Sequence, residues 1–246
     1  MKKLTQDELN LMISKHQEFL YHYDTCITTY GSVEHLKIDH ILLKPSFLNL
    51  ELNNLNFNGA DLREADLRST NLQNANLRNV NLMKADLRGA KAFNADFKES
   101  NLESVLLSGS NLFNADLSGC KLGNANLRDS RLDRTNLSGA YLWNADFENA
   151  SLISSNFNGA NAKLSCFKKA NLMNANLIGA DVSNANFKDA CLIGANLSGV
   201  NLSRTDLRFT NFKGACLIKA DLYGANLDCA NLIGADLTEA RIKYNI

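Results

Sequence analysis

From Leu52 to Ile242, every fifth residue of this chain is apolar, without one insertion or deletion. These 39 positions hold 28 leucines and seven phenylalanines, and the other four are Ala92, Ala162, Val182 and Ile242. Two residues before each of them from Leu62 onward stands a small residue, most often alanine, and the residue in between is mostly Asn or Asp. Strands alternate every two residues and helices roughly every 3.6, so neither element explains a period of five.

A period of five describes a chain that runs straight for three residues and turns a corner in the next two. In each straight piece the small residue and the Leu or Phe face inward, and the Asn or Asp between them faces outward. Corners need residues that tolerate positive φ, and 12 of the 14 glycines fall two places after the large apolar residue. Asn and Asp, the other turn-tolerant types, also hydrogen-bond their own backbone.

The motif A(D/N)LxG, repeated in register over about residues 47–246, resembles the pentapeptide-repeat family. The resemblance implies an all-β solenoid, a right-handed four-sided β-helix with twenty residues per coil. Coils stacked at roughly 4.8 Å would give a rod of roughly 45 Å. Residues twenty apart would then stack, so Phe147, Phe167 and Phe187 should form a ladder. Ala92 and Ala162 should cause local narrowing or small voids.

The first 46 residues lack the repeat and hold all four histidines. Thr5-Gln6-Asp7-Glu8 is a capping box, and Leu4 and Leu9 are placed for a hydrophobic staple. Apolar residues at helical spacing follow, so we predict an amphipathic helix over about residues 6–23 that covers the open first coil. We therefore divide the chain into an N-terminal helical cap and connector, 1–46, and a β-helix, 47–246, with residues 24–46 as the connector.

Catalysis is not expected from this sequence. An active site needs a base, a nucleophile or a metal converging in a concavity, and the repeat region has no histidine and an interior filled with side chains. No cofactor is predicted, and no metal site, because the candidate ligands lack zinc-finger spacing. Those candidates are His16, His22, Cys26, His35 and His40.

The cysteines of the repeat fall in different columns, so no disulfide is expected. Six cysteines without a secretory signal predict free thiols and a cytoplasmic protein, with secretion by another route left open. No apolar run approaches the length of a membrane span.

The outer surface carries the candidate interaction residues. One column, at the residue after the large apolar position, is mostly large and apolar; its members of this kind are Phe93, Phe113, Ile153, Met173, Ile193 and Ile233. Tyr141 and Trp143 on another side add possible anchors. Contiguous exposed apolar surface usually marks contact. The alternative is tolerated surface residues, or a side covered by the N-terminal segment.

A second outer column is largely basic, and its basic members are Arg68, Arg88, Arg128, Lys168, Lys188 and Arg208. Regular charge spacing could track phosphates. The whole chain, however, carries 26 basic and 26 acidic residues, so neighbouring acids favour a solvated face and nucleic-acid binding is not expected.

The favoured function is a non-catalytic protein-interaction scaffold with an unidentified protein partner. Two alternatives stay open. Resemblance suggests a DNA-mimicking modulator of DNA gyrase that confers fluoroquinolone resistance, although such proteins look strongly acidic and this chain is neutral. The other alternative is a secreted bacterial effector. The last residues, 241–246, are too few for a helical cap, so a C-terminal homodimer is a further hypothesis.

Overall fold

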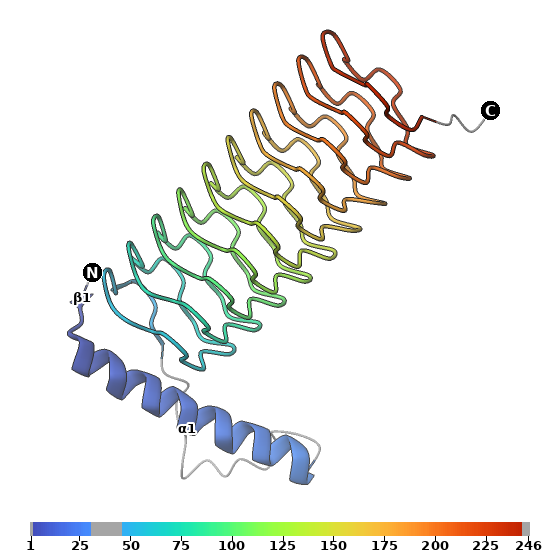
Figure 1. Ribbon diagram of the computed structural model, residues 1–246. Coiled ribbons are helices and arrows are strands. Elements are labelled where there is room, and N and C mark those ends of the chain that lie inside the picture. The colour runs from blue at the N-terminus through green and yellow to red at the C-terminus, as the bar shows by residue number, and fades with distance from the viewer. Residues whose placement is uncertain (1, 31–45, 243–246) are drawn as a thin grey trace.

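The computed structural model describes residues 2–30 and 46–242, with side chains for residues 2–21 and 46–242. Its named elements are strand β1 (Lys2–Lys3), helix α1 (Gln6–Tyr30) and strand β2 (Leu50–Glu51). From Ser46 onward the chain winds into coils that stack into a rod, and α1 lies across the N-terminal end of that rod (Figure 1).

Parallel bridges join residues that are twenty apart along the whole rod. One lap contains the bridges Asp61–Asn81, Asp66–Asp86, Asn71–Lys91 and Asn76–Asp96. Because four bridges at five-residue steps complete each lap, every coil has four sides and twenty residues. This confirms the β-helix that the period of five and the resemblance predict.

Backbone hydrogen bonds between coils hold the stack together. Around Leu127, for example, the Leu127 N–H donates to the carbonyl of Asp146 at 2.7 Å, and the Asp129 N–H donates to that of Glu148 at 3.0 Å. In the other direction, the Asp146 N–H donates to the carbonyl of Ala125 at 2.9 Å. Each coil thus satisfies the polar groups of its neighbours, which a buried backbone requires.

Every fifth residue from Asn49 to Glu239 turns a corner with positive φ; 12 of these residues are glycine and 27 are not. The geometry is that of a type II turn, whose third residue adopts a left-handed conformation that Gly and Asn tolerate best. The outward Asn or Asp supports the turn, as predicted: Asn126 Oδ1 accepts the Arg128 N–H at 3.1 Å.

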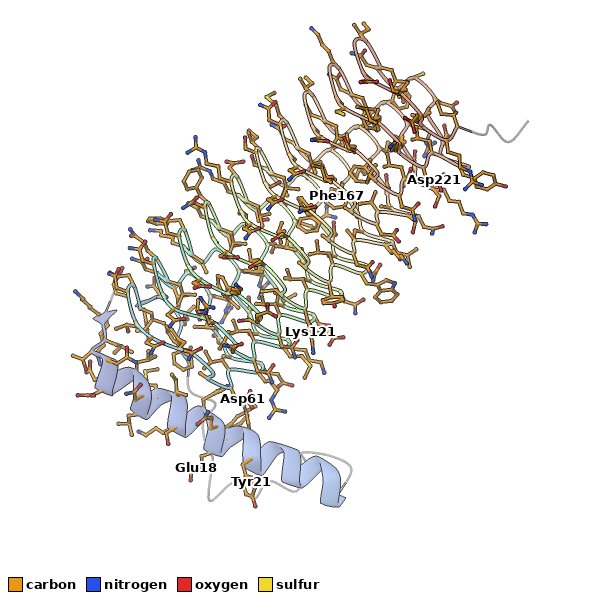
Figure 2. All side chains as sticks on the ribbon, in the orientation of Figure 1. Glu18, Tyr21, Asp61, Lys121, Phe167 and Asp221 are labelled. Carbon is orange, nitrogen blue, oxygen red and sulfur yellow. The ribbon has the colours of Figure 1, made fainter. Side chains whose placement is uncertain are left out.

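The inward residues form one continuous core along the rod. Nearly all of the leucines and phenylalanines of the repeat are fully buried, and so are most of the small residues two places before them. Burial of each large side chain contributes about 1.5–3 kcal/mol before chain entropy is counted. Figure 2 shows Phe167 inside the rod and Lys121 on its outside.

The predicted phenylalanine ladder is present. Phe167 stacks between Phe147 and Phe187, with ring centroids 4.9 and 4.6 Å away. Ala162, in the same coil as Phe167, is fully buried, and so is Ala92 beside Phe97. The local narrowing or small voids expected at these two alanines stay a prediction.

Helix α1 begins as predicted but ends later. The Thr5 N–H donates to Glu8 Oε2 at 2.9 Å and the Glu8 N–H donates to Thr5 Oγ1 at 3.2 Å, which confirms the capping box. The helix continues to Tyr30, so the expected end near residue 23 was wrong, and residues 24–30 are helix rather than connector. Thr and Ile in this stretch are weak helix formers, which is why the sequence suggested an earlier end.

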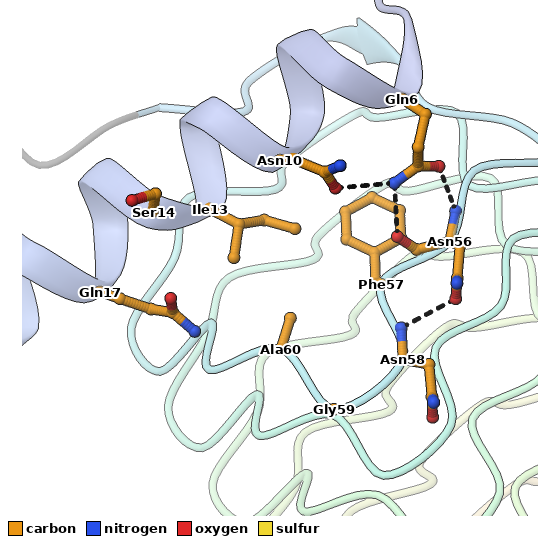
Figure 3. A pocket seen from close by; sticks show the side chains of 10 residues that line it. All are labelled: Gln6, Asn10, Ile13, Ser14, Gln17, Asn56, Phe57, Asn58, Gly59 and Ala60. Carbon is orange, nitrogen blue, oxygen red and sulfur yellow. Dashed lines mark hydrogen bonds between the residues drawn. The ribbon is translucent and has the colours of Figure 1, made fainter.

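The N-terminal segment pairs with the open edge of the first coil. Strand β1 adds to β2 in parallel, with Lys2 opposite Leu50. Further along this edge, the side-chain amide of Gln6 makes the two hydrogen bonds that a neighbouring strand would make. Its Nε2 donates to the Asn56 carbonyl and its Oε1 accepts the Asn56 N–H, both at 2.9 Å (Figure 3). This cap protects an edge that would otherwise attract other chains.

We expect Gln6→Ala to lower the free energy of unfolding by about 1–2 kcal/mol, because it leaves the Asn56 N–H and carbonyl without their protein partners. Gln17→Ala on the same helix is the matched control, since Gln17 is exposed. Urea denaturation measures both. Equal stability of the two variants would show that the Gln6 amide does not support the cap.

Candidate interaction surface

The predicted apolar column runs along one corner of the rod. Ile153, Met173 and Ile193 lie on three successive coils, because the Ser154 N–H donates to the Met173 carbonyl and the Asn174 N–H donates to that of Ile193, each at 2.9 Å. All three apolar side chains are half-buried. We call Ile153, Met173 and Ile193 the aliphatic ladder.

The other members of the predicted surface differ in exposure. Phe93 and Phe113 are half-buried, whereas Ile233 in the last described coil is 70% exposed. The described part of the N-terminal segment lies across the end of the rod and so does not cover the aliphatic ladder (Figure 1).

Phe113 is partly screened by arginines. The guanidinium carbon of Arg131 lies 4.7 Å from the Phe113 ring centroid, and that of Arg134 lies 5.8 Å away. These cation–π contacts occupy ring surface that the sequence suggested was free for a partner. Phe113 is therefore a weaker candidate for contact than the aliphatic ladder.

Asp133 interrupts the column between Phe113 and Ile153. Its carboxylate accepts hydrogen bonds from Arg131 Nε at 2.9 Å and from the Ile153 N–H at 3.2 Å. Partial burial acts to raise the pKa of Asp133, but hydrogen bonds from Ser151 and Arg131 hold this pKa below its usual value. Its negative charge is thus balanced within the protein.

Tyr141 and Trp143 are exposed at another corner, by 58% and 48%. Leu164 lies one coil further on at that corner, is also 48% exposed, and has a φ of 61°. An L-residue pays roughly 1–2 kcal/mol for a left-handed conformation, and this exposed leucine gains little burial in return. We call Tyr141, Trp143 and Leu164 the aromatic corner.

Leu164 was not among the surface residues predicted from the sequence. The sequence does contain a signal for it. Leu164 is a large apolar residue at the corner position of the repeat, two residues after the inward position, where Gly, Asn or another polar residue usually stands. Phe209, 53% exposed with a φ of 60°, shows the same departure. Such departures from local preference concentrate at functional sites.

The basic column is paired with the acidic residues beside it. Its close ion pairs are Arg68–Asp66 at 2.8 Å, Arg88–Asp86 at 2.6 Å, Arg128–Asp146 at 3.1 Å, Lys168–Glu148 at 3.5 Å and Arg208–Asp206 at 2.7 Å. Lys188 lies over the Phe209 ring, 5.8 Å from its centroid.

Two of these pairs lower the pKa of the acid through hydrogen bonds from its arginine. Hydrogen bonds from Arg68 lower the pKa of Asp66, and those from Arg208 lower the pKa of Asp206. Each carboxylate therefore stays charged beside its arginine at neutral pH. The pairing favours a balanced, solvated face over a track for phosphates.

One group of possible metal ligands lies within the described residues: Asp146, Glu148 and Cys166 have ligand atoms within 4.8 Å of one another. Arg128 contacts both carboxylates, and Lys168 contacts Glu148. Burial raises the pKa of the Cys166 thiol, which keeps it protonated. Cations of the protein thus already occupy this acidic group, and its chemistry does not favour a metal.

Five residues were considered as metal ligands in the N-terminal segment. Among them, only the side chain of His16 lies in the part of the chain that the structure describes. Its ring is fully buried, with Nε2 2.8 Å from the Arg63 carbonyl, which places it in the contact between α1 and the first coil. The side chains of His22 and Cys26, together with His35 and His40, lie outside the described residues. Cys120 points inward as predicted, and burial raises its pKa to about 12, so this thiol is unreactive.

Two of the open hollows on the described surface are lined by residues named above. One of about 450 Å³ lies between α1 and the first coil, lined by Ile13, Phe57 and Ala60 together with the amides of Asn10 and Gln17 (Figure 3). The other, of about 540 Å³, lies on the side of the rod next to Tyr141. Neither brings together a nucleophile and a base in a closed pocket.

A family model described as pentapeptide repeats matches the sequence in eight copies, and the matched segments together run from residue 51 to residue 243. The chain belongs to the pentapeptide-repeat family. The family confirms the resemblance on which the coil geometry was predicted. It does not by itself assign a function.

This pentapeptide-repeat chain is similar to several solved structures. HetL, a pentapeptide repeat protein involved in heterocyst differentiation regulation from the cyanobacterium Nostoc sp. strain PCC 7120, is 33% identical over 78% of this chain and 87% of HetL, with a TM-score of 0.47. Full-length QnrB1, a plasmid-mediated fluoroquinolone resistance protein, is 21% identical over 76% of this chain and 91% of QnrB1, with a TM-score of 0.42.

A pentapeptide repeat protein of the Arabidopsis thaliana thylakoid lumen is 26% identical over 46% of this chain and 68% of its own, with a TM-score of 0.21. No curated protein is significantly similar to the sequence. Within the described ranges, no helix has the length and apolar character to cross a bilayer.

Proposed function

We propose that this pentapeptide-repeat protein is a non-catalytic scaffold that binds a protein partner through the outer faces of its rod. The observation that carries the proposal is the placement of large apolar side chains outside the filled core. They form the aliphatic ladder and the aromatic corner, and Leu164 keeps an unfavourable backbone conformation at the second of these. Aromatic and large aliphatic residues are typical anchors of protein interfaces.

The chemistry of the described residues supports a binding role rather than catalysis. Five of the six basic side chains of the basic column are engaged in ion pairs with neighbouring acids, and the inward side chains fill the rod. We infer a right-handed coil and a cytoplasmic location, the first from the family and the second from the free thiols expected of the sequence.

Affinity capture from a lysate of the producing cell tests the proposal. We expect wild type to retain a partner that Met173→Arg or Trp143→Ala loses while its circular dichroism is unchanged. Ser203→Arg, at the corner across the coil from Met173, is the matched control for Met173→Arg only, because the same corner carries Trp143 three coils earlier. If both test variants capture the same proteins as wild type, neither surface is the binding site.

The neutral surface supports scaffolding over imitation of DNA, because a DNA mimic must present unbalanced negative charge. We accordingly expect the protein to leave DNA gyrase supercoiling unchanged, with or without a fluoroquinolone. The effector alternative predicts the protein in the medium or in a host cell, and fractionation distinguishes it from the cytoplasmic scaffold.

We further propose that two copies associate through their C-terminal coils. In the last described coil, the inward side chains Leu227, Leu232 and Leu237 are only partly buried, unlike those of earlier coils. These leucines can be covered either by more of the same chain or by a second copy of the protein. We propose a second copy. Light scattering should give a dimer for wild type and a monomer for Leu232→Asp; a monomeric wild type would contradict it.

A further inference from the structure

We propose that the aliphatic ladder binds an acidic amphipathic helix of the partner, lying along the rod axis. The inference deepens the proposed scaffold function and rests on it. It specifies which kind of partner segment would bind to the face of the rod that carries the aliphatic ladder.

The spacing of the ladder fits a helix better than a strand. Successive coils are roughly 4.8 Å apart, so the ladder from Ile153 to Ile193 spans roughly 10 Å. Two turns of helix advance about 11 Å, which places three apolar residues at positions i, i+4 and i+7 against the three rungs. Residues on one face of a strand are about 6.7 Å apart and would lose register by the third rung.

Exposed basic residues stand at both ends of the ladder. Arg134 is exposed one coil before Ile153, where its guanidinium carbon also lies 5.8 Å from the Phe113 ring centroid, and Lys213 is exposed one coil after Ile193. The acid nearest to this surface, Asp133, is already bound by Arg131, by the Ser151 hydroxyl and by the Ile153 N–H. The ladder is therefore an apolar strip with positive charge at each end.

These two cations define the charge of the partner. They lie four coils apart, roughly 19 Å at the inter-coil spacing, and a helix spans this distance in about 13 residues. Acidic residues near positions i−3 and i+10 would meet both cations while the three apolar residues between them meet the ladder. All five positions lie on one helical stripe.

The same surface fits other anionic partners less well. Phosphates gain nothing from three aliphatic rungs, and a bilayer needs apolar contact broader than a column one residue wide. Charge complementarity together with apolar register favours the acidic helix.

Site-specific photo-crosslinking tests the inference on the full chain. Met173 is replaced by the photo-reactive p-benzoylphenylalanine in one variant, Trp143 in a second and Ser203 in a third, and each is irradiated in lysate. We expect position 173 to crosslink to a protein segment whose sequence has the acidic and apolar spacing given above, and Ser203 to give background only.

Charge reversal supplies the decisive comparison. Arg134→Glu with Lys213→Glu should lower the crosslinking yield at position 173 roughly tenfold, because both end contacts become repulsive. The matched control is Lys84→Glu with Arg204→Glu, which reverses two exposed charges on the corner across the coil and should leave the yield unchanged.

The outcomes separate this inference from the proposed function. A crosslink at position 173 that resists charge reversal, that joins a basic or extended segment, or that joins lipid or nucleic acid overturns the inference. A protein crosslink at position 143 but none at 173 overturns the inference and leaves the scaffold function standing. Background yield at both positions overturns both.

Discussion

Leu127→Asp is expected to lower the free energy of unfolding by more than about 4 kcal/mol and to leave the purified chain largely unfolded at 37 °C. Leu127 is fully buried in the middle of the rod. A carboxylate there has neither water nor a cation to pair with, and every coil depends on contact with its neighbours. Thermal and urea denaturation measure the effect.

The matched control, Asn126→Asp, adds the same carboxylate one residue earlier in the chain. Asn126 faces outward and accepts the Arg128 N–H through an oxygen that Asp also has. We expect this variant to stay within about 0.5 kcal/mol of wild type, as for surface substitutions in general. Similar losses in both variants would contradict the assignment of inward and outward residues.

Phe167→Ala is expected to lower the free energy of unfolding by about 3–5 kcal/mol, the usual cost of removing a buried aromatic ring. The ring stacks on those of Phe147 and Phe187 and contacts Phe157 edge-on, with ring centroids 5.9 Å apart. Because rigid coils on both sides limit collapse, the cavity would remain open. Urea denaturation gives the loss.

Phe209→Ala is the control for Phe167→Ala. It removes the same ring from an exposed corner, and we expect a change of less than about 1 kcal/mol. A loss of several kcal/mol at Phe209, or a negligible one at Phe167, would refute the burial that the coil geometry assigns to them.

The sequence predicted the rod well because one rule repeats along it. The spacing of the leucines assigned which side chains face inward, and the position of the glycines located the corners. Both hold because each coil repeats the contacts of the one before, so a local pattern determines a long-range structure. The capping box was equally readable, since its hydrogen bonds are local.

The details that the sequence did not predict depend on contacts between distant residues. The pairing of Gln6 with Asn56 joins segments that only the folded chain brings together. The screening of Phe113 by Arg131 depends on which way a long side chain bends. Leu164 could have been found from the sequence alone, because a large apolar residue at a corner contradicts the local preference for Gly and Asn.

Amide hydrogen exchange tests the coil geometry most directly. The N–H two residues after each outward Asn or Asp is bonded to that side chain, as in Arg128 to Asn126, whereas the N–H of Leu127 joins two coils. We therefore predict protection factors that repeat every five residues from about Leu52 to Leu222, lowest at the residue after each buried leucine or phenylalanine. Long uninterrupted protected stretches, or a repeat of two residues, would contradict a chain wound in twenty-residue coils.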